Sequence, residues 1–366
     1  MEDLPSKGYK TFKKDTGNLD NPLVINNFNI ETPFYNVEIN KNGLITRLYD
    51  KENDREVIQE NKEANLFCMY EDKPIYYDNW DIDIFYTEKS WNVTDVSKLE
   101  WIEKGPVRAT LLIERYVSKS LIKQKVHFYA NSRRIDFETY VDWKESQCLL
   151  KVHFPVLIHS DEATFDVQFG NLTRKVHTNT SWDKARFESC GQKWIDLSEG
   201  HYGVSLLNDC KYGHSVKDSV MAITLIKSGI EPNPTTDQEE HFFTYSLYPH
   251  KETWKNGGTV QEAYNLNQPC LVENGGTVGD IFGFVSVDKN NIIIETIKKE
   301  ESGDGTIIRL YECENSLTKA KLLVHTPFIK AYSCNLLEEE EEELKVEGNC
   351  ISFISKPYEI ITIKIK

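Results

Sequence analysis

Residues 133–143 read RRIDFETYVDW, and apolar and polar side chains alternate along this stretch. Successive side chains of a β-strand point to opposite faces of its sheet, so the pattern predicts a strand with one buried face and one solvated face. The predicted buried face holds Ile135, Phe137, Thr139, Val141 and Trp143. The predicted solvated face holds Arg134, Asp136, Glu138, Tyr140 and Asp142.

Similar runs lie on both sides of this strand. VRATLLIERYV at 107–117 and LIKQKVHFYA at 121–130 precede it, and short alternating runs follow at regular spacing to the closing YEIITIKIK. FYNVEINKNGLITRLYD at 34–50 holds two such runs around Asn42-Gly43, a dipeptide that favours a type I′ hairpin turn because both positions need positive φ. Many short strands separated by turn signals predict an all-β sandwich protein.

A chain of 366 residues is long enough for one large sandwich and a smaller one. The stretch 253–266, TWKNGGTVQEAYNL, is the one place where a short helix is expected, and Asn267-Gln268-Pro269 after it predicts a domain boundary near residue 266. We therefore expect a linker at 1–25, a large sandwich at 26–266 and a small sandwich at 267–366. The six glutamates at 338–343 are interpreted as a solvated turn or edge.

The composition narrows the possible partners and the compartment. With 43 Lys and Arg against 58 Asp and Glu, the net charge is −15, which disfavours nucleic acid and anionic membrane surfaces as partners. Eight cysteines stand at wide spacings with no Cys-x-x-Cys pair, as free thiols in a reducing compartment do. No apolar leader or membrane-length apolar stretch is present, so the sequence predicts a soluble, cytoplasmic protein.

Common catalytic motifs are missing from the sequence. It contains no G-x-S-x-G elbow, no phosphate-binding glycine loop and no H-E-x-x-H pair. His153 and His159 flank the apolar run KVHFPVLIH and are interpreted as structural residues. No catalytic residue and no metal ligand is assigned to this chain.

Residues 76–83, YYDNWDID, combine aromatic rings with carboxylates and an amide. Sugars are bound by aromatic faces that stack on C–H patches and by polar groups that pair with hydroxyls, so this mixture suits a saccharide site. A turn whose Asp and Asn side chains bond to backbone amides is the alternative. The candidate ligand-binding residues here are Asp78, Trp80, Asp81 and Asp83.

A second dense segment spans residues 179–213. It contains Trp182, Arg186, Glu188 and Trp194, and the polar cluster Asn208, Asp209, Lys211 and Tyr212 follows a predicted strand. Spacing alone does not separate core tryptophans and surface ion pairs from a binding site. The candidate binding residues in this segment are Asn208, Asp209, Lys211 and Tyr212.

The amino-acid sequences of several segments resemble those of a known protein family. YYDNWDID, SWDKARFE, QKWIDLSEGHYGVSLLNDCKYGHSV, FTYSLYPH and the terminal KPYEIITIKIK resemble, in this order, the C-terminal region of glycoside hydrolase family 38 alpha-mannosidases of the bacterial and fungal type. The similarity extends from Tyr9 to the last predicted strand. So many ordered matches exclude coincidence.

The resemblance implies a galactose mutarotase-like supersandwich followed by a smaller sandwich. It further implies that residues 1–25 link these to an N-terminal catalytic domain of the same polypeptide, which holds zinc and the nucleophilic carboxylate. The complete enzyme would hydrolyse terminal alpha-linked mannose with retention, while this part supports the catalytic domain and lines the sugar pocket. The isolated chain is then expected to be inactive, with a possible homo-oligomer as its assembly.

Two other functions remain open from the sequence. One is a stand-alone carbohydrate-binding or aldose-mutarotase-like protein, which needs a histidine and a glutamate facing a sugar, and no matched pair is evident. The other is a purely structural domain without a ligand.

Overall fold

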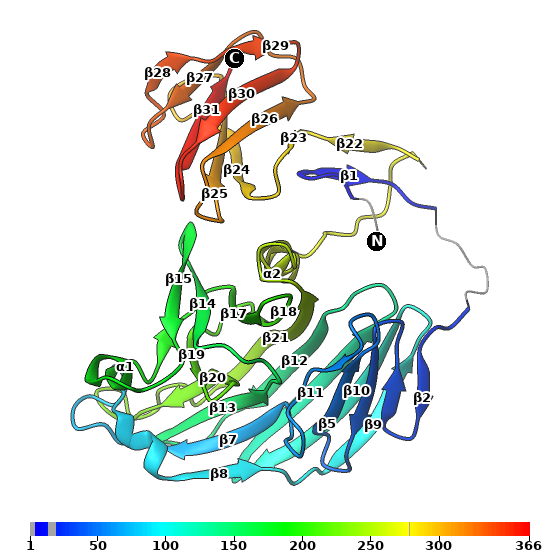
Figure 1. The fold of residues 1–366 in the computed structure, drawn as a ribbon, viewed down its shortest axis with the longest axis vertical. Helices are drawn as coiled ribbons and strands as arrows, with labels where there is room; N and C mark the ends of the chain where they lie inside the picture. The colour runs from blue at the N-terminus through cyan, green and yellow to red at the C-terminus, as the bar shows by residue number, and fades with distance from the viewer. Residues whose placement is uncertain (1–3, 14–19, 278) are drawn as a thin grey trace. The chain divides into compact units, whose positions relative to one another are not determined.

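The computed structural model describes residues 4–13, 20–277 and 279–366, and β-strands dominate it (Figure 1). The helices in these ranges are the 3-10 helix η1 (Ile84–Glu88), α1 (Ser181–Ala185) and α2 (Thr259–Asn267). The all-β fold class predicted from the alternating runs is confirmed.

The chain divides into two compact units, and each is described here by itself. The larger unit comprises the described residues of Asn18–Val167 together with Leu172–Cys270. The smaller unit comprises the described residues of Met1–Gly17 together with Gln168–Asn171 and Leu271–Lys366.

Three antiparallel sheets form most of the larger unit. The nine-stranded sheet has the order β15 (Gly170–Lys175), β14 (Glu162–Val167), β17 (Trp194–Glu199), β18 (Tyr202–Asn208), β21 (Glu240–Lys251), β12 (Ile135–Asp142), β11 (Ser120–Tyr129), β10 (Arg108–Val117), β9 (Lys98–Lys104). The six-stranded sheet has the order β16 (Ser189–Cys190), β19 (Gly213–Lys217), β20 (Val220–Ser228), β13 (Cys148–Pro155), β7 (Leu66–Glu71), β8 (Ser90–Val93). The five-stranded sheet has the order β2 (Val24–Asn26), β3 (Asn29–Glu31), β4 (Tyr35–Ile39), β5 (Ile45–Asp50), β6 (Arg55–Glu56).

Buried residues of all three sheets, including Val37 and Leu48 of the five-stranded sheet, form the core of the larger unit. The ring of Phe137 on β12 stacks on Tyr245 of β21 at 5.0 Å and lies 5.5 Å from Phe154 of β13 in the facing sheet. All five residues of the predicted buried face of β12 are buried, which confirms the alternation at residues 135–143. The sequence pattern therefore forms a sandwich by burying one face of each sheet against the other.

Asp136 is an exception on the predicted solvated face of β12. It is only 4% exposed, and its carboxylate accepts hydrogen bonds from Arg134, from the Tyr129 hydroxyl and from Ser246. Its predicted exposure was wrong because local ion pairing and hydrogen bonds make burial of this charge acceptable, which the alternation does not reveal.

The hairpin at 34–50 forms, with β4 paired to β5, but its turn is not type I′. Gly43 has a φ of 70°, whereas Asn42 is not among the residues with positive φ. The Asn40 side chain accepts hydrogen bonds from the amides of Asn42 and Leu44, and the pairing register shifts between Glu38 and Ile39. The turn is therefore longer than two residues, and a single left-handed glycine closes it.

Two further antiparallel sheets form a small sandwich in the smaller unit. One has the order β23 (Val285–Val287), β26 (Thr318–Val324), β30 (Cys350–Ser355), β29 (Val346–Glu347). The other has the order β24 (Ile292–Lys299), β25 (Thr306–Glu312), β31 (Ile360–Ile365), β27 (Ala331–Cys334), β28 (Glu340–Glu343). Buried side chains from both sheets, including Leu322 and Ile363, form one separate core.

The glutamate run contributes the edge strand β28 of this sandwich. Glu340–Glu343 are exposed, as the solvated interpretation predicts. Glu338 differs, because it is only 7% exposed and its carboxylate accepts hydrogen bonds from Lys298 and from the amide of Glu301. The run thus combines one buried, paired glutamate with an exposed edge.

The expected linker contains a strand, and the expected domain boundary contains a helix. Gly8–Lys10, placed in the expected linker, form strand β1 and pair with β22 (Ile281–Gly283). Residues 1–3 and 14–19 of that linker lie outside the described residues. Helix α2 occupies the later part of the stretch 253–266 and begins after Gly258, whose φ is 78°.

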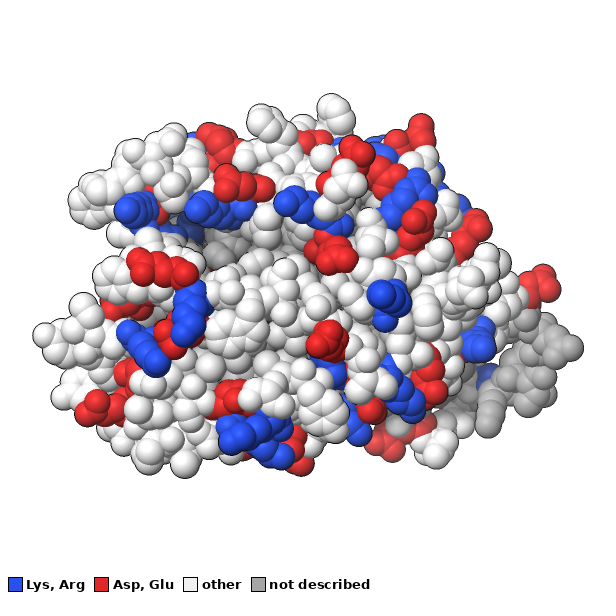
Figure 2. Space-filling view, turned by 90° about the horizontal axis from the view of Figure 1, so that it is seen from below, with Lys and Arg blue, Asp and Glu red and all other residues white. Residues whose placement is uncertain are grey.

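The state of the cysteines and the distribution of surface charge can be read from the structure. All eight cysteines are free thiols in the structure. Figure 2 shows one face on which acidic and basic side chains are interspersed around a broad uncharged area. Within the described ranges no helix combines the length and the apolar character that crossing a membrane requires.

Candidate functional site

The loop that contains Asp78 is held against the end of β20. The Asp78 carboxylate accepts hydrogen bonds from the amides of Ile230 and Glu231, at 2.9 and 2.8 Å. A Cβ at position 229 would lie 2.7 Å from the carbonyl carbon of Asp78, so Gly229 permits this close approach. Asp78 is only 5% exposed and serves as an anchor for the loop.

Electrostatics supports the same role for Asp78. Burial alone would raise the pKa of Asp78, but the amides of Glu231 and Ile230, with Gln147 and Lys227, outweigh it and hold the pKa below its usual value. Asp72 nearby forms an ion pair with Lys227 at 2.8 Å, yet burial raises its pKa. Asp78 is therefore ionised at neutral pH and engaged by the protein itself.

The rest of this loop presents its side chains outward. Trp80 is 75% exposed, and its ring lies 5.4 Å from that of Tyr77. Asp81 is exposed and bonds to the adjacent amide of Ile82, while Asp83 accepts a hydrogen bond from the amide of Ile75. Trp80 and Asp81 are thus the members of the predicted set at 76–83 that remain accessible to a ligand.

The second predicted cluster follows β18. Asn208 is fully buried, and its side chain bonds to the amide of Lys211 and to the carbonyl oxygen of Gln192. Asp209 accepts a hydrogen bond from the amide of Thr244 at 2.9 Å. Both side chains therefore hold the backbone of neighbouring segments in place through hydrogen bonds.

Lys211 and Tyr212 lie at the end of this cluster. The Lys211 ammonium is 4.7 Å from the centre of the Phe243 ring. Tyr212 is 46% exposed, so its ring is the accessible one of the second cluster. Asp209 and Phe243 line a groove of about 440 Å³ on the nine-stranded sheet, and the loop at 76–83 contributes nothing to that groove.

A buried polar cluster connects helix η1, which follows the loop at 76–83, to the second predicted segment. The Tyr86 hydroxyl of η1 donates to the carboxylate of Glu188 at 2.7 Å, and Glu188 forms an ion pair with Lys151 of β13. Lys151 also donates to the Ser215 hydroxyl at 2.9 Å. Burial raises the pKa of Tyr86, so its hydroxyl stays protonated and donates. The cluster attaches η1, just beyond the loop at 76–83, to the segment after α1.

Comparisons with known proteins match two separate parts of the chain. Residues 30–235 match the family model described as Glycosyl hydrolases family 38 C-terminal domain, and residues 291–363 match the family 38 C-terminal beta sandwich domain. The chain belongs to this family. The resemblance found in the sequence motifs is therefore confirmed.

Relatives of this family 38 chain include two mannosidases. Alpha-mannosidase G of Dictyostelium discoideum is 35% identical over 350 residues, which cover 92% of this chain and 32% of the relative. Human Alpha-mannosidase 2C1 is 33% identical over 336 residues, with 89% and 32% covered. The chain spans about a third of the length of the curated relatives it matches.

Solved structures show the same fold. An alpha-mannosidase from Enterococcus faecalis V583 superposes with a TM-score of 0.74 at 18% identity, covering 92% of this chain and 42% of that one. A second family 38 protein from Enterococcus faecalis gives 0.78 at 17% identity, covering 97% and 46%. At these identities the likeness concerns the fold.

Several residues that position these two predicted segments were not singled out from the sequence. Lys151 stands within the buried run LLKVHF, and a charge amid apolar strand residues is a signal of a buried partner. Lys227 gives a similar signal at the end of MAITLIK. Helix α1 was also missed, although Thr180 and Asp183 form a capping box at its start.

Asp237, Glu239 and His241 bring their potential ligand atoms within 4.8 Å of one another. Asp237 lies in a turn before β21, with a φ of 58° and its carbonyl oxygen bonded to the amide of Glu239, and this turn brings the three residues together. Nε2 of His241 is already hydrogen-bonded to the carbonyl oxygen of Asp237 at 2.8 Å. With that nitrogen engaged and Glu239 exposed, the group does not fit a closed zinc site.

Proposed function

We propose that this chain is the C-terminal part of an alpha-mannosidase, and that the parent enzyme hydrolyses terminal alpha-linked mannose with retention. The observation that carries the proposal is the family 38 match over residues 30–235, together with 35% identity to Alpha-mannosidase G. The catalytic carboxylates and zinc would belong to a catalytic domain elsewhere in the same polypeptide. The absence of disulfides and the acidic surface suit the cytoplasm as its location.

This chain would contribute a wall of the mannose pocket and support the catalytic domain. The anchored loop at 76–83 suits this role, because Asp78 fixes the backbone while Trp80 presents an exposed ring and Asp81 an exposed carboxylate. An aromatic face can stack on the C–H patch of a sugar, and a carboxylate can accept bonds from its hydroxyls. Tyr212 would add a second aromatic contact of the same kind.

A fusion experiment tests the proposal. The part of Alpha-mannosidase G outside the matched region is joined to this chain, and hydrolysis of an aryl alpha-mannoside is measured beside the unfused chain. We expect hydrolysis by the fusion and none by the chain alone, with or without added zinc. A fusion that melts as one folded protein, yet hydrolyses no alpha-mannoside, would contradict the assignment, as would zinc-dependent hydrolysis by the chain alone.

A further inference from the structure

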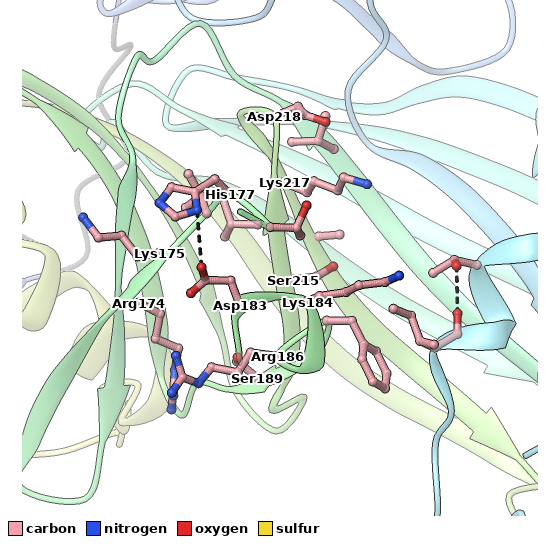
Figure 3. Close-up of a pocket in the computed structure, with 18 of the residues that line it drawn as sticks. Arg174, Lys175, His177, Asp183, Lys184, Arg186, Ser189, Ser215, Lys217 and Asp218 are labelled. Carbon is pink, nitrogen blue, oxygen red and sulfur yellow. Dashed lines mark hydrogen bonds and ion pairs between the residues drawn. The ribbon is translucent and has the colours of Figure 1, made fainter. Parts of the chain in front are cut away.

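A pocket of about 660 Å³ lies in the larger unit, and none of the residues of the loop at 76–83 lines it (Figure 3). Its walls come from β15, from α1 and the residues after it, from η1, and from β19 and β20. This volume is in the range of ligand sites for small molecules.

The charge of this pocket is opposite to that of the protein. Five Lys or Arg side chains and two Asp side chains line it, whereas the whole chain carries a net charge of −15. Figure 3 shows Arg174 and Arg186 at one end of the pocket and Lys217 at the other. A recess lined by one sign of charge concentrates ions of the opposite sign.

Most of the cations lack a carboxylate partner. Lys175 forms ion pairs with Asp161 and Glu162, at 2.9 and 2.8 Å. Across the described ranges, the lining cations that form no ion pair are Arg174, Lys184, Arg186 and Lys217. The buried Nε of Arg174 also has no hydrogen-bond partner among these residues. An unsatisfied guanidinium nitrogen beside a cavity is costly unless a ligand completes its hydrogen bonds.

The two acidic side chains do not neutralise the pocket. The carboxylate of Asp183 accepts bonds from the amide and hydroxyl of Thr180, as part of the capping box of α1, and faces His177 at 3.6 Å. Asp218 is exposed in the turn between β19 and β20. The pocket therefore keeps an excess of positive charge.

The interior of the pocket suits a ring with hydroxyl groups. Phe187 supplies half-buried aromatic surface and Ser189 a hydroxyl. Phe165 and Tyr86 are buried beneath the lining, with the Arg174 guanidinium 5.4 Å from the centre of the Phe165 ring. Burial lowers the pKa of His153 to about 4, so this lining histidine is neutral at pH 7 and adds a polar, uncharged edge. Guanidinium groups bind phosphate in bidentate fashion, and several cations match its double negative charge.

We propose that this pocket binds a phosphorylated sugar, with its phosphate at Arg174 and Arg186 and its ring against Phe187. A nucleic acid is disfavoured, because the cations line a recess in an acidic protein and form no extended basic stripe. The pocket shares no lining residue with the loop at 76–83, and the test of this proposal does not depend on alpha-mannosidase activity.

Calorimetric titration of the 366-residue chain tests this site with mannose 6-phosphate as the probe. We expect saturable binding that weakens as NaCl is raised from about 0.05 M to about 0.3 M, because salt screens the charges. Inorganic phosphate should bind more weakly, and mannose should give no measurable binding. Equal binding of mannose and its phosphate, or no saturable binding of the phosphate, would overturn the proposal.

Matched variants locate the binding site. Arg174→Gln combined with Arg186→Gln should weaken mannose 6-phosphate binding by about tenfold or more, the effect of losing hydrogen bonds to a charged group. Lys175→Gln removes a neighbouring charge that is already paired and should change the affinity less than about twofold. If the double arginine variant fails to fold, the exposed Lys184→Gln and Lys217→Gln replace it. Unchanged affinity in folded variants of either pair would reject the site.

Discussion

The Tyr86 hydroxyl lies 2.7 Å from a carboxylate oxygen of Glu188, across 102 residues of sequence. Tyr86 closely follows the exposed loop with Trp80, and Glu188 follows helix α1. Because Glu188 is also paired with Lys151 in the buried strand β13, this bond connects the chain just beyond the loop to the sandwich core, in addition to the anchor at Asp78. Loss of the hydroxyl should therefore affect folding stability.

Tyr86→Phe tests that connection. The change removes a bond to a charged acceptor, so we expect the free energy of unfolding in urea to fall by about 1.5 to 3 kcal/mol. The matched control is Tyr140→Phe, whose hydroxyl donates to the exposed Glu240 at 2.8 Å and should change stability by less than about 1 kcal/mol. Equal effects of the two changes would show that the Tyr86 bond has no special role.

Asp78→Ala should destabilise the chain. It leaves the amides of Ile230 and Glu231 without their acceptor, at an expected cost of about 2 to 3 kcal/mol in urea unfolding at pH 7. The exposed Asp81→Ala serves as the control and should cost less than about 0.5 kcal/mol. If Asp78→Ala unfolds like the unchanged chain, the loop is anchored by other contacts.

The Asp78 effect should depend on pH. Its pKa is lowered in the folded state, so its contribution is present above the unfolded pKa of about 4 and is lost as pH falls through the folded pKa. The stability difference between Asp78→Ala and the unchanged chain should therefore shrink in acid. A difference that stays constant below about pH 4 would contradict the assigned pKa direction.

Two neutral buried histidines predict a second acid effect. Burial lowers the pKa of both His153 and His214 to about 4, below the value of about 6.5 in an unfolded chain. The unfolded state then binds more protons between these values, so stability should fall as pH drops from about 6.5 towards 4. His153→Gln should flatten this dependence, whereas the exposed His201→Gln should leave it unchanged. Urea unfolding measured at several pH values checks both.

Trp80 and Asp81 should matter for catalysis in the fusion with Alpha-mannosidase G. Asp81→Asn should lower kcat/KM by about tenfold to a hundredfold if its contact tightens in the transition state, and Trp80→Ala should also lower it. Neither change should shift Tm appreciably, because both side chains are exposed. The core change Phe137→Ala should do the reverse, costing about 3 to 5 kcal/mol of stability. If the Trp80 and Asp81 variants instead melt at a lower temperature and keep full specific activity, the loop has a structural role and does not contact the substrate.

The alternation of apolar and polar residues predicted the strands well, because a sheet that buries one face needs apolar side chains at every second position. Phe137 and Val141 are buried as expected, and the three strands from 108 to 142 lie side by side in order. Asp136 and Glu338 were misplaced because specific partners, Arg134 and Lys298, compensate their burial. Arg134 is close in sequence, but Ser246, which also bonds to Asp136, and Lys298 are distant from their partners along the chain, and a one-dimensional pattern does not reveal such contacts.

The candidate site was only partly predictable. The residue types in YYDNWDID indicated polar contacts, but only the structure separates Asp78, which holds the backbone, from the accessible Trp80. Asn208 and Asp209 likewise satisfy backbone groups. Short polar side chains perform both tasks, so their presence in a motif does not distinguish them. The cationic pocket was not predicted at all, because its walls come from segments far apart in sequence.

The exposed glutamates of β28 have a consequence for self-association. Among the described residues, this strand ends its sheet and leaves one row of backbone groups without a neighbouring strand, which is the geometry on which sheets of separate molecules join. A second copy approaching this edge would bring four more carboxylates against Glu340–Glu343. Glu340 and Glu343 are ion-paired with Lys366 and Lys330, so repulsion between two such edges at neutral pH would come mainly from Glu341 and Glu342, and protonation in acid would remove it.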